Sequence, residues 1–218
     1  MIKNNAVIFD MDGIIFDSER LSLVCWEKMA EKYHLEGMDE AYPPCIGTNE
    51  ARTREIITNY YGTDFPYDTF RKETYELFRR MTERDGLPLK KGVSELLEYL
   101  NKNDIPVGLA SSTSLAIVTE ELQQAGLYDF FRAVTGGDQL KRSKPEPDIY
   151  LTACEKLGVK PEDTYAVEDS YNGIRSAHSA GMMPIMVPDL LPPTDEMRRK
   201  SVAVLDDLLQ VRDWFADR

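Results

Sequence analysis

The sequence predicts an α/β protein, in which a Rossmann-like parallel sheet core is interrupted by an inserted all-helical cap domain. Along most of the chain, short runs of β-branched and aromatic residues alternate with helical patterns, as in βαβ units. The exception is the stretch 17–86, where only helical periodicity is present. We therefore predict a Rossmann-like core of residues 1–16 and 87–218 and a helical cap domain of residues 17–86.

The first strand is predicted at Ala6–Phe9, where four apolar residues follow one another without polar alternation. Such runs indicate strands that are buried on both faces, as in a parallel sheet. The same pattern predicts further strands at residues 105–110, 133–135, 164–167, 184–187 and 202–204. Between and after them, apolar residues spaced three and four positions apart predict helices around residues 93–100, 115–122 and 208–214.

The predicted cap domain is divided into helices by glycine and proline. Apolar helix faces are expected within residues 21–30, 56–60 and 70–81, one of them containing Val24 and another Tyr60. The breakers between them are Gly37, Pro43-Pro44, Gly62 and Pro66. The alternative is that these helices pack against the sheet as extra helices.

Composition limits the function classes. The chain has 218 residues, 42% of them hydrophobic, and no apolar stretch approaches the ~20 residues of a membrane span. The net charge of −12 argues against nucleic acid or an anionic membrane as a partner. Three scattered cysteines without metal-ligand spacing, and a first strand too close to Met1 for a signal peptide, lead us to expect a reduced, cytoplasmic protein.

Two carboxylates follow the first predicted strand. Asp10 and Asp12 stand two positions apart, so we expect their side chains to face the same way, and Gly13 lets the backbone approach a ligand. Two acids so close repel each other unless a cation or a shared proton intervenes. Mg²⁺ is the expected cation, because it prefers oxygen ligands and commonly joins carboxylates to a phosphate.

Other polar side chains accompany later segments. Ser111 and Ser112 end one apolar run, Lys144 stands just before a predicted helix, and the Glu168-Asp169 pair ends another run. Open parallel sheets bind ligands outside the carboxyl ends of their strands, so we expect these side chains to share one crevice. Carboxylates, hydroxyls and a lysine suit phosphoryl transfer.

Each motif alone has a simpler interpretation. Asp and Gly are common in turns, Ser111-Ser112 could cap a helix, Lys144 could be solvated, and Glu168-Asp169 could precede a helix as its cap. Their joint occurrence, with three of the four motifs at strand ends, favours a single site.

The ordered set Asp10-x-Asp12-Gly13, Ser111, Lys144 and Glu168-Asp169 resembles the four signature motifs of the haloacid dehalogenase superfamily of phosphotransferases. The resemblance spans residues 6 to about 188. Within the superfamily, the chain is most similar to the subgroup that contains β-phosphoglucomutase and many small sugar-phosphate phosphatases.

This resemblance implies a mechanism. Asp10 would attack phosphorus and form an aspartyl-phosphate, while Asp12 would protonate the leaving oxygen and later take a proton from the acceptor. Ser111, Ser112 and Lys144 would bind the phosphoryl oxygens. The implied ligands of Mg²⁺ are Asp10, Asp12 through its backbone carbonyl, Glu168 and Asp169. The helical domain would be a mobile cap that closes over the substrate.

The resemblance leaves the acceptor open between water and a bound sugar phosphate. The mutase of this subgroup carries a histidine where Leu21-Ser22 stands here, and a basic pair near the position of Gly47. Arg52 and Arg54 lie nearby but out of register.

We therefore expect a Mg²⁺-dependent phosphatase that acts on a small phosphorylated metabolite. We expect it to be a monomer and to have neither nucleic acid nor a membrane as a partner. The alternatives are a phosphosugar mutase of the β-phosphoglucomutase type and a catalytically silent relative that binds a phosphorylated ligand or a partner protein. The presence of both Asp10 and Asp12 disfavours the silent relative.

Overall fold

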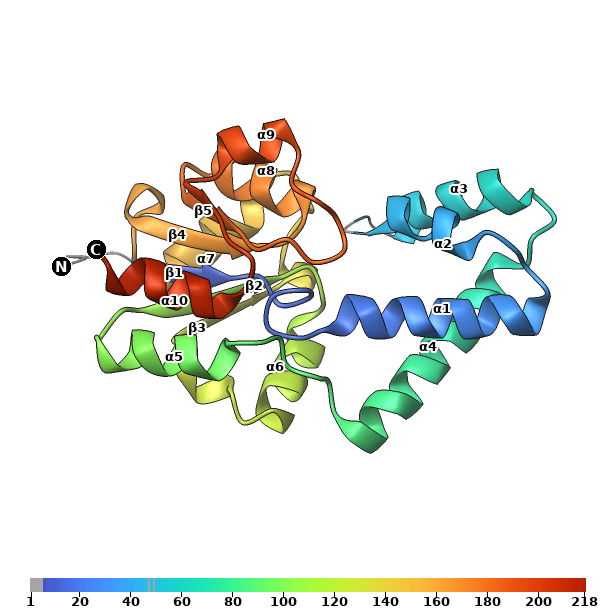
Figure 1. The fold of residues 1–218 in the computed structure, drawn as a ribbon, viewed down its shortest axis with the longest axis horizontal. Helices are drawn as coiled ribbons and strands as arrows, with labels where there is room; N and C mark the ends of the chain where they lie inside the picture. The colour runs from blue at the N-terminus through green and yellow to red at the C-terminus, as the bar shows by residue number, and fades with distance from the viewer. Residues whose placement is uncertain (1–5, 47, 49) are drawn as a thin grey trace. The chain divides into compact units, whose positions relative to one another are not determined.

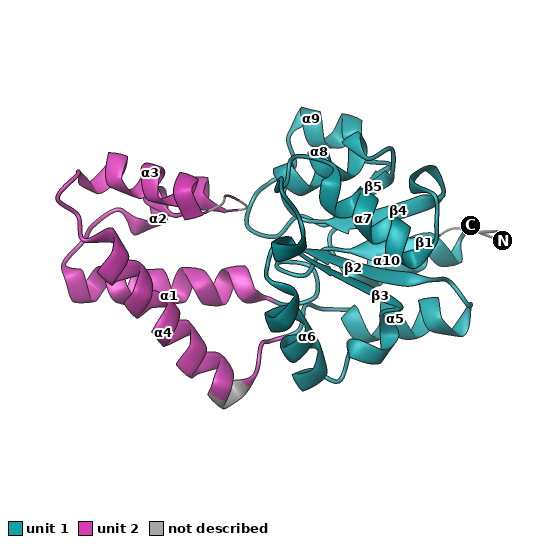
Figure 2. Ribbon diagram, turned by 180° about the vertical axis from the view of Figure 1, so that it is seen from behind, with its two compact units in different colours: residues 1–16, 89–218 teal, residues 17–88 magenta. Residues whose placement is uncertain are grey.

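The protein divides into two compact units, which are coloured separately in Figure 2. The computed structural model describes residues 6–46, 48 and 50–218, except for the side chains of residues 84 and 85. The core unit comprises Met1–Phe16 and Leu89–Arg218, and the helical unit comprises Asp17–Pro88. Contacts end the helical unit at Pro88, whereas the extent of the helical periodicity predicted residue 86.

The core unit is built on one parallel sheet of six strands in the order β3-β2-β1-β4-β5-β6. The strands are β1 (Ala6–Phe9), β2 (Val107–Ser111), β3 (Ala133–Gly136), β4 (Thr164–Glu168), β5 (Met183–Met186) and β6 (Ala203–Val204). Every residue of the three central strands, β2, β1 and β4, is buried, as their uninterrupted apolar patterns predicted. The predicted α/β fold class is confirmed.

Helices cover both faces of this sheet (Figure 1). The core helices are α5 (Val93–Lys102), α6 (Leu115–Gln124), α7 (Asp148–Leu157), α8 (Tyr171–Ser179), α9 (Asp195–Lys200) and α10 (Leu208–Ala216). Short 3₁₀ helices are η2 (Tyr128–Phe130), η3 (Gly137–Gln139) and η4 (Pro161–Asp163). On one face, Ile8 and Ala166 pack in a buried cluster with Tyr150 of α7 and Ala177 of α8. On the other face, the Tyr165 ring lies 5.2 Å from the Phe215 ring of α10.

The helical unit has its own aromatic core. It contains α1 (Ser18–Tyr33), α2 (Met38–Ala41), the 3₁₀ helix η1 (Pro43–Cys45), α3 (Glu50–Tyr61) and α4 (Tyr67–Asp85). Trp26 is buried, and its ring lies 5.3 Å from those of both Tyr42 and Phe70. Two residues expected on buried faces are instead exposed, Val24 by 37% and Tyr60 by 46%. On α1 the buried position belongs to Trp26 instead of Val24, and the Tyr60 hydroxyl donates to Glu40 at 3.0 Å in an exposed contact.

The helical unit is inserted between two adjacent segments of the core unit. Phe16 and Leu89 form an antiparallel bridge, and the Lys90 N–H donates to the Ile15 carbonyl at 2.9 Å. The points at which the chain leaves and re-enters the core unit are therefore neighbours. The role of the helical unit as a mobile cap stays a prediction.

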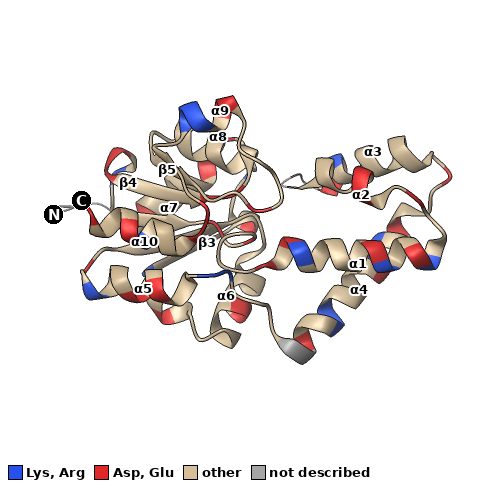
Figure 3. Cartoon of the chain, in the orientation of Figure 1, with Lys and Arg blue, Asp and Glu red and all other residues tan. Residues whose placement is uncertain are grey.

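Acidic residues are not confined to either of the two units. Acidic residues are spread over the helices of both units, whereas Arg198, Arg199 and Lys200 gather in the last turn of α9 (Figure 3). Among the described residues, no helix is both long and apolar enough to cross a membrane. Cys25, Cys45 and Cys154 are free and buried.

Candidate active site

Three neighbouring strands bring the predicted motifs to one edge of the sheet. Asp10 directly follows β1, Ser111 is the last residue of β2, and Glu168 is the last residue of β4. Because β2, β1 and β4 are adjacent and parallel, their carboxyl ends meet. The Asp10 N–H donates to the Val167 carbonyl at 3.0 Å, which holds the chain beside β4 after β1 has ended.

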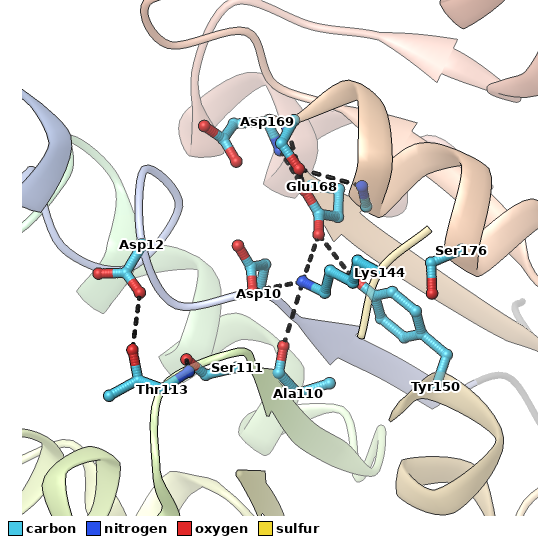
Figure 4. A network of polar contacts seen from close by, with 12 residues as sticks. Asp10, Asp12, Ala110, Ser111, Thr113, Lys144, Tyr150, Glu168, Asp169 and Ser176 are labelled. Atoms are coloured by element: carbon cyan, nitrogen blue, oxygen red, sulfur yellow. Dashed lines mark hydrogen bonds and ion pairs between the residues drawn. The ribbon is translucent and has the colours of Figure 1, made fainter. Parts of the chain in front are cut away.

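Lys144 joins these strand ends from the loop that precedes α7. Its Nζ lies 2.7 Å from Asp10 Oδ1, 2.5 Å from Glu168 Oε1 and 3.5 Å from the Ala110 carbonyl oxygen (Figure 4). The side chain is only 6% exposed, so the ammonium depends on these acceptors instead of water. Burial by itself would lower the pKa of Lys144, but Asp10 and Glu168 outweigh it and raise that pKa, so the lysine stays charged.

Glu168 is fully buried and accepts hydrogen bonds on both carboxylate oxygens. Oε1 accepts from Lys144 Nζ at 2.5 Å and from the Tyr150 hydroxyl at 3.0 Å. Oε2 accepts from the Asp169 N–H, the Ser170 N–H and the Ser170 hydroxyl, each at 3.0 Å. This carboxylate is therefore fixed in place, and a metal would have to share its oxygens with donors that already occupy them.

Asp10, Glu168 and Asp169 form a cluster that could hold a metal ion. Each offers a carboxylate oxygen, and these oxygens lie within 4.8 Å of one another. Burial, followed by the charge of Glu168, raises the pKa of Asp10 to about 8, although Lys144 opposes this shift. The Lys144 ammonium thus binds two of the three buried acidic side chains of this cluster.

This donor set fits Mg²⁺, because a divalent cation would offset the remaining negative charge and prefers oxygen ligands. Asp10, Asp169 and Glu168 each offer a carboxylate oxygen to this cluster, and both Glu168 oxygens also accept hydrogen bonds from the protein.

Asp12 has a different environment from Asp10. Its Oδ2 accepts a long hydrogen bond from the Thr113 hydroxyl at 3.4 Å, and Figure 4 shows its carboxylate turned toward Thr113 and away from Lys144. The expectation that both acids face the same way rested on strand alternation, which ends with β1 at Phe9. Asp12 lies beyond that point, in a turn that pairs with Phe16. The Asp10 carboxylate therefore binds Lys144 and the Asp12 carboxylate binds Thr113, so the two acids have different environments and can take different chemical roles.

The two predicted phosphate-binding serines differ in exposure. Ser111 is completely buried, and its Oγ accepts a hydrogen bond from the Thr113 N–H at 3.1 Å. Ser112 is exposed on the loop that follows β2. Ser111 is next to Ala110, whose carbonyl oxygen Lys144 approaches, so this loop lies beside the lysine.

Two glycines let the carboxylates occupy their positions. A Cβ on Gly13 would lie 2.4 Å from Asp169 Oδ2, and Gly13 also has a positive φ of 78°. A Cβ on Gly173 would lie 1.7 Å from Glu168 Oε1. Neither position accepts a side chain unless an acidic residue of the site moves. Gly13 belongs to the first motif that the sequence singled out, and Gly173 lies in the first turn of α8; the structure gives both glycines a steric reason.

Some polar partners of the site were not identified from the sequence. Thr113 contacts Asp12, Tyr150 contacts Glu168, and Ser170 both contacts Glu168 and caps α8 by accepting from the Gly173 N–H at 3.0 Å. The Ser176 hydroxyl donates to the Glu146 carbonyl at 2.6 Å and ties the Lys144 loop to α8. Tyr150 and Ser170 belong to the stretches 144–150 and 168–173, which resemble the wider motifs of the subgroup, and this was the available signal. Thr113 and Ser176 had no such signal.

Comparisons with known proteins agree with this geometry. The sequence profile of the family described as haloacid dehalogenase-like hydrolase matches residues 7–187. The chain is 33% identical over 177 residues to the phosphorylated carbohydrates phosphatase of Thermotoga maritima, covering 81% of this chain and 82% of that protein. It is 32% identical over 191 residues to the beta-phosphoglucomutase of Bacillus subtilis, covering 84% of this chain and 82% of that protein.

A solved structure shares the fold along nearly the whole chain. It is that of a HAD family hydrolase from Deinococcus radiodurans R1 with bound phosphate and sodium, with a TM-score of 0.79 and 25% identity. The match covers 97% of this chain and 95% of that one. Since the family profile spans most of the chain and includes all four motifs, this protein belongs to the haloacid dehalogenase-like hydrolase family.

Proposed function

We propose that the protein is a Mg²⁺-dependent phosphatase that hydrolyses a small phosphate monoester through an aspartyl-phosphate on Asp10. The observation that supports this most is the buried Lys144 ammonium, which binds Asp10 and Glu168 at the carboxyl edge of the sheet. The phosphatase of T. maritima, whose name specifies phosphorylated carbohydrates, supports a sugar phosphate or a related metabolite as substrate.

Asp10 is the proposed nucleophile. It is buried beside Lys144, whose hydrogen bond to Oδ1 fixes the orientation of the carboxylate. A covalent intermediate would split one difficult displacement into two easier ones. Lys144 would also neutralise charge that accumulates on the phosphoryl oxygens, together with the Ser111 hydroxyl and the exposed Ser112.

Asp10, Asp169 and the Asp12 backbone carbonyl would hold Mg²⁺, with Glu168 as a further candidate ligand. When bound, the metal would supply positive charge that reduces the repulsion between an anionic nucleophile and an anionic phosphate. The Glu168 carboxylate holds the Lys144 ammonium and accepts from the Asp169 N–H, so it would keep these neighbours in place.

Asp12 is the proposed general acid and base. It lies outside the Lys144 hydrogen-bond network and has the Thr113 hydroxyl as a partner. It would donate a proton to the leaving oxygen and then accept one from water. Positioned acid–base groups of this kind contribute on the order of 10²–10⁴-fold to rate.

Water is the proposed acceptor, and the contacts of two arginines support this choice over a second sugar phosphate. Arg54 makes two hydrogen bonds to Asp68 and lies over the Tyr67 ring, while Arg52 donates to Glu55 at 2.6 Å. Both guanidinium groups therefore already bind carboxylates within the helical unit. The basic pair of the mutase is expected near Gly47, which lies outside the described residues.

We further propose that the protein works as a cytoplasmic monomer on small metabolites, with neither nucleic acid nor a membrane as partner. The net charge of −12 supports this, because polyanionic partners would be repelled. Because the same negative charge would repel an anionic phosphate, groups within the site must attract the substrate. Lys144, the metal and backbone N–H groups would provide this attraction.

The test is phosphate release from p-nitrophenyl phosphate and a panel of phosphorylated sugars and polyols, with Mg²⁺ or with chelator. We expect metal-dependent release from several monoesters. Absence of release under both conditions would indicate the silent relative. β-Glucose 1-phosphate with catalytic glucose 1,6-bisphosphate separates the remaining alternatives: the phosphatase yields phosphate faster than glucose 6-phosphate, and the mutase yields the reverse.

A further inference from the structure

Tyr150 meets two charged groups of the site at once. It lies in the first turn of α7 and is completely buried. Its hydroxyl donates to Glu168 Oε1 at 3.0 Å, and its ring centroid lies 5.2 Å from Lys144 Nζ. Figure 4 shows the side chain beside Lys144 with its hydroxyl directed toward Glu168.

The hydroxyl and the ring act on different parts of the same ion pair. Glu168 Oε1 is shared between Lys144 and Tyr150, so the tyrosine hydroxyl fixes the oxygen that the ammonium binds. The ring offers its electron-rich face to the ammonium without accepting one of its three N–H bonds. Those N–H groups remain available to Asp10, Glu168 and the Ala110 carbonyl.

A packing role explains the ring but not the hydroxyl. Tyr150 belongs to the buried cluster between the sheet, α7 and α8, where a phenylalanine would fill the same space. A buried hydroxyl lowers stability unless it is hydrogen-bonded, and here its partner is a carboxylate of the site. The two contributions are therefore separable by removing one oxygen atom.

We propose that Tyr150 is a positioning residue for phosphoryl binding, acting through Glu168 and Lys144. Its hydroxyl keeps Glu168 Oε1 where Lys144 can bind it and Asp10 together, so that the ammonium stays aimed at the phosphoryl group. Without the hydroxyl, Glu168 Oε1 has Lys144 as its remaining donor among the described contacts and draws the ammonium toward itself. This proposal rests on the proposed phosphatase function.

The first measurement compares Tyr150→Phe with the wild type in kinetics and in the affinity for inorganic phosphate with saturating Mg²⁺. We expect kcat/KM to fall about 10-fold and the phosphate Kd to rise about 3- to 10-fold, in line with loss of one hydrogen bond to a charged group. Tyr128→Phe is the matched control, because Tyr128 is 36% exposed on the core unit, and it should change neither value by more than about twofold. Unchanged kcat/KM and phosphate Kd in Tyr150→Phe would overturn the proposal.

A double-mutant cycle distinguishes positioning from stability. In a Lys144→Ala background, Tyr150→Phe should change phosphate affinity by less than about twofold, because the group it positions is gone. Any effect on melting temperature should persist in both backgrounds. Equal losses of phosphate affinity in both backgrounds would show that Tyr150 acts through the fold alone and would contradict the proposal. Should Tyr150→Phe fail to fold, Tyr150→Leu, which also lacks a donor, replaces it in the same cycle.

Failure of the proposed function has a different signature. If the wild-type protein releases no phosphate from any monoester, the phosphatase proposal fails. The phosphate-binding cycle still tests Tyr150 in that case, since it requires no turnover.

Discussion

At Glu168, five donors from the Lys144 loop, α7 and the start of α8 converge on one buried carboxylate. Asp10 is also buried, and burial together with the nearby Glu168 charge raises its pKa to about 8. Glu168 thus organises the site, and Asp10 is the carboxylate that gains most from a cation.

The raised pKa of Asp10 makes Mg²⁺ binding depend on pH. Below about pH 8, a proton on Asp10 must be displaced by the metal, so affinity should rise with pH by at most about tenfold per unit until about pH 8. The sign for stability is opposite. The unfolded chain loses this proton near pH 4, so without metal the Asp10 contribution to the free energy of unfolding falls as pH rises from about 4 to 8.

Calorimetric titration of Mg²⁺ in two buffers of different ionisation enthalpy measures the released proton directly. Glu121→Gln is the control, because burial, with a contribution from Asp12, raises the pKa of Glu121 to about 7. It should leave the proton release intact if Asp10 is the source. Mg²⁺ affinity that does not change between about pH 6 and 8 would contradict this account.

At the scale of elements, the end of β3 supports the loop that follows β2. The Leu115 N–H at the start of α6 donates to Asp138 Oδ1 at 2.8 Å, and the Gly137 N–H donates to the Thr113 carbonyl at 2.8 Å. A Cβ on Gly137 would lie 2.2 Å from the Ser112 carbonyl oxygen, so the segments touch through glycine backbone. The helix cap of α6 is therefore supplied by Asp138 of η3, directly after β3, instead of by Ser114, whose side chain makes no capping bond.

This support predicts a difference between two substitutions. Asp138→Ala removes the acceptor and should lower the free energy of unfolding by about 0.5–2 kcal/mol, as loss of a cap does, and should weaken phosphate binding through the loop. Asp138→Asn retains an acceptor oxygen and should recover most of both properties. Chemical denaturation and phosphate titration measure them. If both variants bind phosphate as the wild type does, the loop does not need this support.

The sequence was sufficient for the elements that carry the site and insufficient for the contacts between them. Strands β1 and β4 were predictable because Ala6–Phe9 and Thr164–Val167 are uninterrupted apolar runs, and parallel pairing then brings Asp10 and Glu168 together. Asp138 was not predictable as the cap of α6, since it lies 23 residues from Leu115 and no periodicity links them. The contact of Tyr150 with Glu168 is similarly long-range, at a separation of 18 residues.

The buried faces of the helical unit were the least predictable part. Spacing placed Phe70 on an apolar face, and it is buried, but spacing did not reveal that Trp26 of α1 packs against it at the centre. Tertiary packing decided between these faces.

For the whole molecule, the adjacency of Phe16 and Leu89 predicts that the core unit folds without the insert. A variant in which residues 17–88 are replaced by a short Gly/Ser linker closes a small loop, at a low entropic cost. We expect it to unfold cooperatively and to bind Mg²⁺, because Asp10, Glu168 and Asp169 all belong to the core unit. Circular dichroism and calorimetry test this. A variant that is unfolded or does not bind Mg²⁺ would show that the core unit depends on residues 17–88.

The central claim is that Asp10 accepts the phosphoryl group before water does. Its most direct test is mass spectrometry of the protein after acid quenching during turnover of a phosphate monoester with Mg²⁺. We predict a covalent phosphate on the peptide that contains Asp10, absent with chelator and absent in Asp10→Asn, whose kcat should fall by about 10³-fold or more while the fold is retained. Two results would contradict the claim: a wild-type protein that hydrolyses the monoester without forming this adduct, or an Asp10→Asn variant that keeps more than about a tenth of wild-type kcat.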